Sequence, residues 1–135
     1  MADDLNWLLS RLVEKVPSAR SAVLLSADGI AKNWHGLARD DADQLAALAS
    51  GMCSLAKQVG TRFGDGDDGV RQVVTELGEV ILFVTAAGAG SVLAVLAGRD
   101  VNANSLSYEM GRLGTQIPSH LSTPARQPVA QQGNW

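Results

Sequence analysis

The sequence is poor in the residues that build disulfide frameworks and metal centres. Its single cysteine, Cys53, cannot form a disulfide within the chain, so a reducing compartment is the simplest interpretation. The two histidines, His35 and His120, are far apart, and neither has a cysteine or a second histidine at the spacing of a metal site. We therefore expect neither a metal ion nor another cofactor.

Basic clusters and long hydrophobic runs are also missing. Eleven Lys and Arg residues against fourteen Asp and Glu residues give a net charge of -3, which argues against nucleic acid as a partner. No apolar run approaches the roughly 20 residues of a membrane span. Residues 1–4, Met-Ala-Asp-Asp, lack the positive start of a secretory signal. We expect a cytoplasmic protein without direct membrane insertion, which could associate with a membrane through its partners.

Motifs for catalysis and ligand binding are absent or incomplete. The nucleophile motif G-x-S-x-G does not occur. Residues 88–93 begin like a dinucleotide-binding loop, but leucine stands in place of the third glycine. Asp65, Asp67 and Glu76 match ligand positions of a calcium loop. Val70 stands where that loop needs glycine, so a solvated acidic loop is the better interpretation. A Ser-His-Asp set formed in space stays open, but no motif supports one, and we predict that the chain is not an enzyme.

Periodic apolar residues predict an alternation of helices and strands in one domain. The 135 residues are 46% hydrophobic, enough for one core. Helical spacing predicts helices over residues 4–16, 41–62 and about 104–117, with Pro118 stopping the last one. Apolar runs separated by glycine-containing turns predict the strands 20–27, 30–35, 70–77, about 80–87 and about 91–98.

The turn at Asp28-Gly29 decides whether the first apolar run belongs to a phosphate loop. A phosphate loop needs a helix next, with its N-terminus aimed at the anion. Here a second strand follows after two residues, so we interpret the pair as a type I′ hairpin turn.

The character of each strand predicts its place in the sheet. Strands 20–27, 80–87 and 91–98 carry runs that are apolar on both faces, which is typical of central strands. Strands 30–35 and 70–77 carry polar residues on both faces and should be edges. With hairpins between neighbours, we predict an α+β (mixed α/β) fold: a five-stranded antiparallel sheet of order 2-1-5-4-3 in the topology α-β-β-α-β-β-β-α. The long helix should cover one face and the two terminal helices the other.

The helix over residues 41–62 has two distinct faces. One face should pack on the core and contains Leu45, Leu48, Ala49, Met52, Leu55, Ala56 and Val59. The other is small and weakly polar, and contains Ala46, Ala47, Ser50, Gly51, Ser54 and Lys57. Because an ordinary surface helix is charged there, we favour a face covered by a second helix; a solvated alanine-rich face is the alternative. Together with the open edge of strand 70–77, this indicates a dimer.

The segments VLLSADGIAKN (residues 23–33) and DQLAALASGMCSLA (residues 43–56) resemble the roadblock family of dynein light-chain-like domains. The chain is most similar to the bacterial branch, especially the roadblock component of actinobacterial conservon operons. The resemblance runs over residues 5–117 in order and spacing. We therefore expect a roadblock-like domain over residues 1–117 and a flexible Pro/Gln-containing tail over 118–135.

This resemblance implies a homodimer that binds a Ras-like small GTPase, in which the GTPase holds the nucleotide. The predicted dimer interface joins the long helices and the third strands and consists of Ala47, Ser50, Gly51, Ser54, Val70, Gln72, Val74 and Glu76. The predicted GTPase contacts are Lys57, Gln58 and Arg62. The implied function is a non-catalytic regulator of the nucleotide cycle in bacterial signalling, with a sensor histidine kinase as a further partner. The alternatives are a passive scaffold for the kinase and the GTPase, or a small-molecule-sensing domain.

Overall fold

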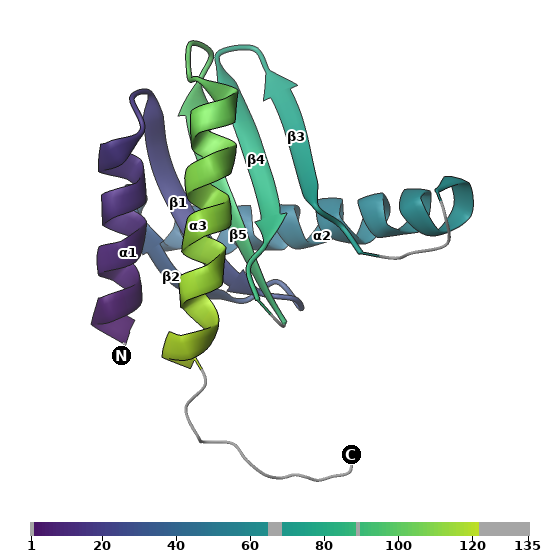
Figure 1. The fold of residues 1–135 in the computed structure, drawn as a ribbon, viewed down its shortest axis with the longest axis horizontal. Coiled ribbons are helices and arrows are strands. Elements are labelled where there is room, and N and C mark those ends of the chain that lie inside the picture. Colours follow the sequence, from purple (N-terminus) through teal and green to yellow (C-terminus); the bar gives the residue numbers. More distant parts are fainter. Residues whose placement is uncertain (1, 65–68, 89, 122–135) are drawn as a thin grey trace, which may run out of the picture.

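A computed structural model describes residues 2–64, 69–88 and 90–121, and these form the predicted sequence of elements (Figure 1). In chain order the elements are α1 (Ala2–Lys15), β1 (Ala19–Ser26), β2 (Ala31–His35), α2 (Arg39–Phe63), β3 (Gln72–Leu77), β4 (Val80–Ala86), β5 (Ser91–Gly98) and α3 (Ala103–Leu121). None of the described helices is long and apolar enough to cross a membrane. The predicted tail begins inside α3, and its residues 122–135 lie outside the described part of the chain.

The five strands form one antiparallel sheet in the order β2-β1-β5-β4-β3, which confirms the predicted fold class. The central β1 and β5 pair along almost their whole lengths, from Ala19 opposite Ala97 to Ser26 opposite Ser91. β2 and β3 are the two edges, as their polar composition predicts. Within the described residues β3 pairs only with β4, so one side of its backbone has no strand next to it.

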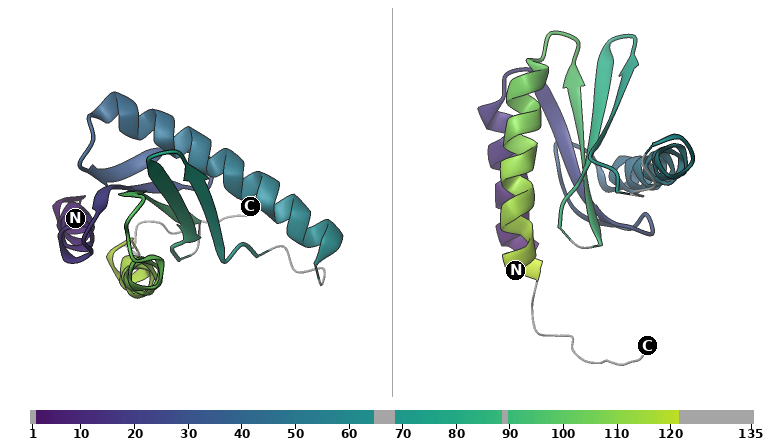
Figure 2. Two further views of the ribbon diagram at one scale, coloured as in Figure 1. Left: turned by 90° about the horizontal axis from the view of Figure 1, so that it is seen from above. Right: turned by 45° about the vertical axis from the view of Figure 1, so that its right-hand side comes forward.

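Helices cover both faces of the sheet in three layers (Figures 1 and 2). α1 and α3 lie side by side on one face, over a core that includes Leu9, Phe83 and Leu106. α2 lies on the other face, over a second core that includes Val23 and Val84. Because side chains alternate along each strand, alternate residues of the same strands supply the two cores.

The β1–β2 turn differs from the predicted type I′ hairpin. Asp28 does not have a positive φ; among the two residues only Gly29 does, at +90°. The amide of Gly29 donates to the carbonyl of Ser26, and the amide of Ser26 donates to that of Ile30. These bonds close a three-residue loop with glycine in the left-handed position, and the Ser26 hydroxyl donates to the carboxylate of Asp28. The prediction of a hairpin was right and its turn type was wrong.

Two helix ends also differ from the sequence prediction. α3 continues through Pro118 to Leu121, because a proline removes only one main-chain hydrogen bond of a helix and does not always end it. α2 begins two residues before Asp41, with Ala38 as its N-terminal cap residue and no side-chain cap bond. Asp40 and Asp41 therefore lie in the first turn, where their negative charge suits the helix dipole.

The predicted core face of α2 was wrong for three residues. Leu48, Leu55 and Val59 are 61%, 65% and 58% exposed. The helix instead packs Ala42, Ala46 and Ala49 against the sheet, all fully buried. Leu45 is buried as predicted, at the border of the two faces. Small side chains let the helix axis approach the strands closely, and this turns the larger apolar side chains away from the sheet.

Candidate functional site

The exposed apolar side of α2 is the most unusual surface of the described molecule. Large apolar side chains recur at spacings of seven, four and four residues, which places them on one side of the helix. These four residues, the α2 apolar stripe, are Leu48, Leu55, Val59 and Phe63. Phe63 at the end of the helix is 78% exposed. A single exposed apolar residue is ordinary, but a continuous stripe of this kind marks an interaction surface.

The packing of α2 explains why this stripe is left outside. The hydroxyl of Ser50 donates to the carbonyl of Ala27 in the β1–β2 turn at 2.9 Å. A Cβ on Gly29 would lie 3.4 Å from that of Ser50, so the turn and the helix are in close contact. On β3, at the other edge of the sheet, the Thr75 hydroxyl donates to the sulfur of Met52 at 3.9 Å. These contacts fix the rotation of the helix about its own axis.

The length of α2 leaves its second half without cover from the sheet. With 25 residues it is roughly 37 Å long, at 1.5 Å per residue. It runs across the strands, and five strands at about 4.8 Å spacing span roughly 20 Å. Figure 1 shows the C-terminal part of α2 extending past β3, beyond the edge of the sheet. Every residue buried in α2, from Ala42 to Ala49, lies in its first half.

The open edge of β3 lies beside the middle of α2. The strand is six residues long, and its Val74 and Leu77 are each 48% exposed. An edge of this kind presents main-chain donors and acceptors to any further strand. The bond between Thr75 and Met52 ties this edge to α2, so the stripe and the edge form one continuous surface. We call it the α2–β3 surface.

Five of the eight predicted dimer residues are exposed on the two elements that form this surface. Ala47, Gly51 and Ser54 are exposed on α2. Val74 and Glu76 are exposed on β3, but they lie opposite Phe83 and Ile81 of β4, so their side chains are on the α1–α3 face of the sheet. The remaining three predicted residues are placed differently. Ser50 is held by the β1–β2 turn, the amide of Gln72 donates to Ser107 of α3 at 2.9 Å, and Val70 is half-buried just before β3. Their roles in a dimer stay predictions.

The predicted GTPase contacts also lie on α2. Lys57, Gln58 and Arg62 are exposed on its second half, the part that extends beyond the sheet. Lys57 lies about half a turn around the helix from the apolar stripe, whereas Arg62 lies next to Leu55 and Val59. Their role in binding a GTPase stays a prediction.

Sequence reasoning assigned Leu48, Leu55 and Val59 to the core and did not consider Phe63. Helical periodicity identifies an apolar face but does not say what covers it. One signal was present: an apolar pattern that reaches Phe63 is longer than a five-stranded sheet is wide. The excess length points to a cover from outside the chain.

The described residues offer little for catalysis. No three of their His, Cys, Asp and Glu side chains are grouped as metal ligands would be. Burial raises the pKa of the Cys53 thiol, which disfavours the reactive thiolate. Of the calcium-loop candidates, Glu76 is exposed in β3, and Asp65 and Asp67 lie outside the described residues.

Comparisons with known protein families and solved structures point to one family. The family model of the Roadblock/LC7 domain matches residues 5–97. A Roadblock/LC7 domain from Streptomyces avermitilis superposes with a TM-score of 0.84 at 55% identity, covering 87% of this chain and 98% of that one. A second domain from this organism has a TM-score of 0.67 at 36% identity, covering 84% and 97%. Myxococcus xanthus MglB has a TM-score of 0.79 at 16% identity over 94% of each chain, a likeness of fold alone. No curated protein matches.

Proposed function

Because this chain belongs to the Roadblock/LC7 domain family, we propose that it is a homodimeric, non-catalytic regulator of a Ras-like small GTPase in bacterial signalling. The observation that carries the proposal is the α2–β3 surface, an apolar helix face beside an open strand edge. The GTPase holds the nucleotide, and the dimer supplies a surface that alters the nucleotide cycle. The resemblance to conservon components supports a cytoplasmic location and a sensor histidine kinase as a further partner, through which the dimer would reach a membrane.

A two-fold axis beside β3 would cover both the α2 apolar stripe and the open β3 edge with the same elements of a second copy. In a symmetric dimer the same patch meets itself, so α2 packs against α2 and β3 pairs with β3. Burying a large apolar side chain is worth about 1.5–3 kcal/mol, and the stripe offers four such side chains from each copy. Ala47 and Gly51 flank the stripe and are small enough for a close helix approach. We propose an interface centred on the stripe, with Ser50 serving the fold of its own chain.

The GTPase is proposed to bind the α2 helices where they extend beyond the sheet. Lys57, Gln58 and Arg62 are exposed there, with Arg62 beside the stripe and Lys57 on the opposite side of the helix. A site composed of both α2 helices depends on the dimer, so a monomeric variant should lose GTPase binding even with these three residues intact.

The oligomeric state tests the dimer directly. Leu55→Arg places a charge at the centre of the stripe, and burying it unpaired should raise the dimer dissociation constant by about a hundredfold or more. Sedimentation equilibrium should then give the mass of one chain. Thr61→Arg is the matched control, since Thr61 is exposed about half a turn away from the stripe. A Leu55→Arg variant that keeps the dimer mass would contradict the proposed interface.

Two assays separate the regulator from the alternatives. A scaffold would gather the GTPase and the kinase without changing the rate of GTP hydrolysis, whereas a regulator changes that rate. A small-molecule sensor would show ligand-induced shifts of the melting temperature. Two hollows bear on the sensor alternative: the one between α1 and α3 has a volume of about 60 Å³, whereas a wider one lined by Arg20, Glu79, Arg99 and Asp100 has about 420 Å³ and is the site that this assay would test. Small-molecule sites usually measure roughly 300–1,000 Å³.

A further inference from the structure

The face opposite the α2–β3 surface carries a small groove between α1 and α3. Its floor consists of Leu8, Leu12 and Leu113, which are nearly buried and join the two helices through the core below. The recess has a volume of about 60 Å³, enough for one side chain and too small for a cofactor. We call it the α1–α3 groove.

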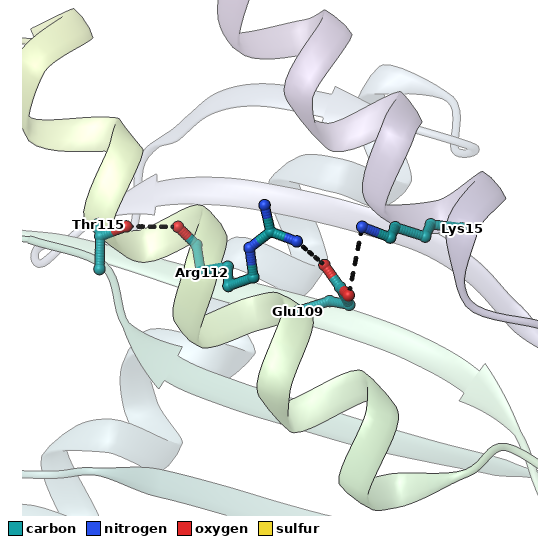
Figure 3. Close-up of polar contacts among 4 residues, drawn as sticks. All are labelled: Lys15, Glu109, Arg112 and Thr115. Atoms are coloured by element: carbon teal, nitrogen blue, oxygen red, sulfur yellow. Dashed lines mark hydrogen bonds and ion pairs between the residues drawn. The ribbon is translucent and has the colours of Figure 1, made fainter.

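The rim of this groove is positively charged in a chain whose net charge is -3. Lys15 of α1 and Arg112 of α3 share one carboxylate, that of Glu109, at 3.4 Å and 3.6 Å (Figure 3). Arg11 is a third cation on the rim. Glu109 is only 17% exposed, whereas Lys15 and Arg112 are about half exposed. The cations can therefore reach a further anion while still holding Glu109, and the rim has two positive charges in excess.

An exposed aromatic residue borders the cationic rim. Trp7 is 57% exposed, and the guanidinium of Arg11 lies 4.8 Å from the centroid of its ring. Tryptophan and arginine are enriched among the residues that contribute most to protein interfaces. The acid Glu14, three residues after Arg11, accepts a hydrogen bond from Ser10 and does not line the groove. The groove thus combines an apolar floor, a cationic rim and an aromatic border.

We propose that the α1–α3 groove binds an acidic segment of a partner protein, an amphipathic helix with Asp and Glu beside its apolar residues. One apolar side chain fills the recess over the leucine floor, and the flanking carboxylates pair with Arg11, Lys15 and Arg112. Charge complementarity and the recessed apolar floor favour a peptide over a lipid surface, which is better bound by a broad cluster of basic residues. The groove lies on the opposite face of the sheet from α2, so this proposal does not depend on the dimer.

A designed peptide tests the charge requirement. The probe is a fluorescent helical peptide of Leu and Glu, and its control has Lys in place of every Glu. The acidic peptide should bind in fluorescence anisotropy, more weakly at high salt, and the basic peptide should not. Arg112→Gln should weaken binding about threefold, as for a partly exposed ion pair, while Arg99→Gln, which removes a cation that does not line the groove, changes nothing. Arg11→Glu combined with Arg112→Glu should weaken it at least about tenfold.

Glu109→Gln separates charge recognition from a merely structural role. Removing this carboxylate frees Lys15 and Arg112, so the acidic peptide should bind about two- to fivefold more tightly. If the ion pairs of Glu109 served only to hold α1 and α3 in place, this variant would bind the acidic peptide more weakly. Glu79→Gln is the matched control, because it removes an exposed carboxylate paired with Arg99 and should leave binding unchanged. Equal binding of both peptides, no binding of the acidic one, or binding of phosphatidylserine vesicles in its place would overturn the proposal.

Discussion

At the scale of single residues, the two phenylalanines have opposite surroundings. Phe83 on β4 is 1% exposed; it lies opposite Val95 of β5 and belongs to the core beneath α1 and α3. Phe63 at the end of α2 is 78% exposed. Phe83→Ala should lower the free energy of unfolding by about 3–5 kcal/mol, measured by urea denaturation. Phe63→Ala should change the stability of the monomer by no more than about 0.5 kcal/mol and weaken the dimer in sedimentation. Equal effects on stability would contradict the assignment of Phe63 to the surface of the chain.

Ser18 and Asp100 form a second residue pair with a testable consequence. The Ser18 hydroxyl donates to the Asp100 carboxylate at 2.7 Å and, ahead of the main chain and Arg20, holds the pKa of that carboxyl below its usual value. A lowered folded-state pKa stabilises the fold above about pH 4, and this contribution is lost as the pH falls through the folded pKa.

Ser18→Ala should therefore raise the pKa of Asp100 towards its ordinary value, as an NMR titration of the carboxyl would show. The unmodified chain should have a larger free energy of unfolding than Ser18→Ala above about pH 4, and this difference should disappear in acid. Asp28 is the internal control, because the Ser26 hydroxyl lowers its pKa and this bond is untouched. An unchanged Asp100 pKa would show that the Ser18 hydroxyl is not the main cause of the shift.

At the scale of elements, the sheet follows from the sequence and the rotation of α2 does not. Hairpin turns fix which strands are neighbours, and runs that are apolar on both faces identify the central strands, so the order could be predicted. α2 has two faces that could each be buried, one of leucines and one of alanines. Its rotation is set by close packing of Ala46 and Ala49 on the strands and by the contact of Ser50 with the β1–β2 turn, neither of which periodicity reveals.

The sequence predicts the two elements that carry the candidate site, α2 and β3, but not the residues of its apolar stripe. The small size of Ala47, Gly51 and Ser54 predicts an interaction surface on α2, which stays a prediction, whereas the polar composition of β3 predicted an edge strand, which the sheet order confirms. The turn at Gly29 shows the same limit: the Asp28-Gly29 pair signals a hairpin, but the number of loop residues is set by main-chain bonds that form in the folded state.

The edge of β3 gives a prediction for this element. In the proposed dimer both sides of the β3 main chain are paired, so all amides from Gln72 to Leu77 should exchange slowly with deuterium. In Leu55→Arg, alternate β3 amides should exchange at least about tenfold faster, because they face solvent in the monomer. Amides of the central strand β1 should be unaffected and serve as the control. Fast alternate exchange in the unmodified protein would place the dimer contact elsewhere.

At the scale of the whole molecule, the two faces of the sheet support different surfaces. The α2–β3 surface is apolar, and we propose that it binds a second copy of the chain. The α1–α3 groove is cationic and recessed, which suits an acidic partner. Because the two surfaces lie on opposite faces, a dimer would present its grooves and its α2 helices to different partners at the same time.

The central claim is that the paired α2 helices bind a Ras-like GTPase and sense its nucleotide. The most direct measurement is a binding titration against the Ras-like GTPase encoded nearest to this gene, loaded with GDP or with a non-hydrolysable GTP analogue. We predict binding with at least about a fivefold preference for one nucleotide state, since coupling of this size defines a regulator. Leu55→Arg should abolish that binding. Equal affinity for both states would make the protein a scaffold, and no binding in either state would contradict the account.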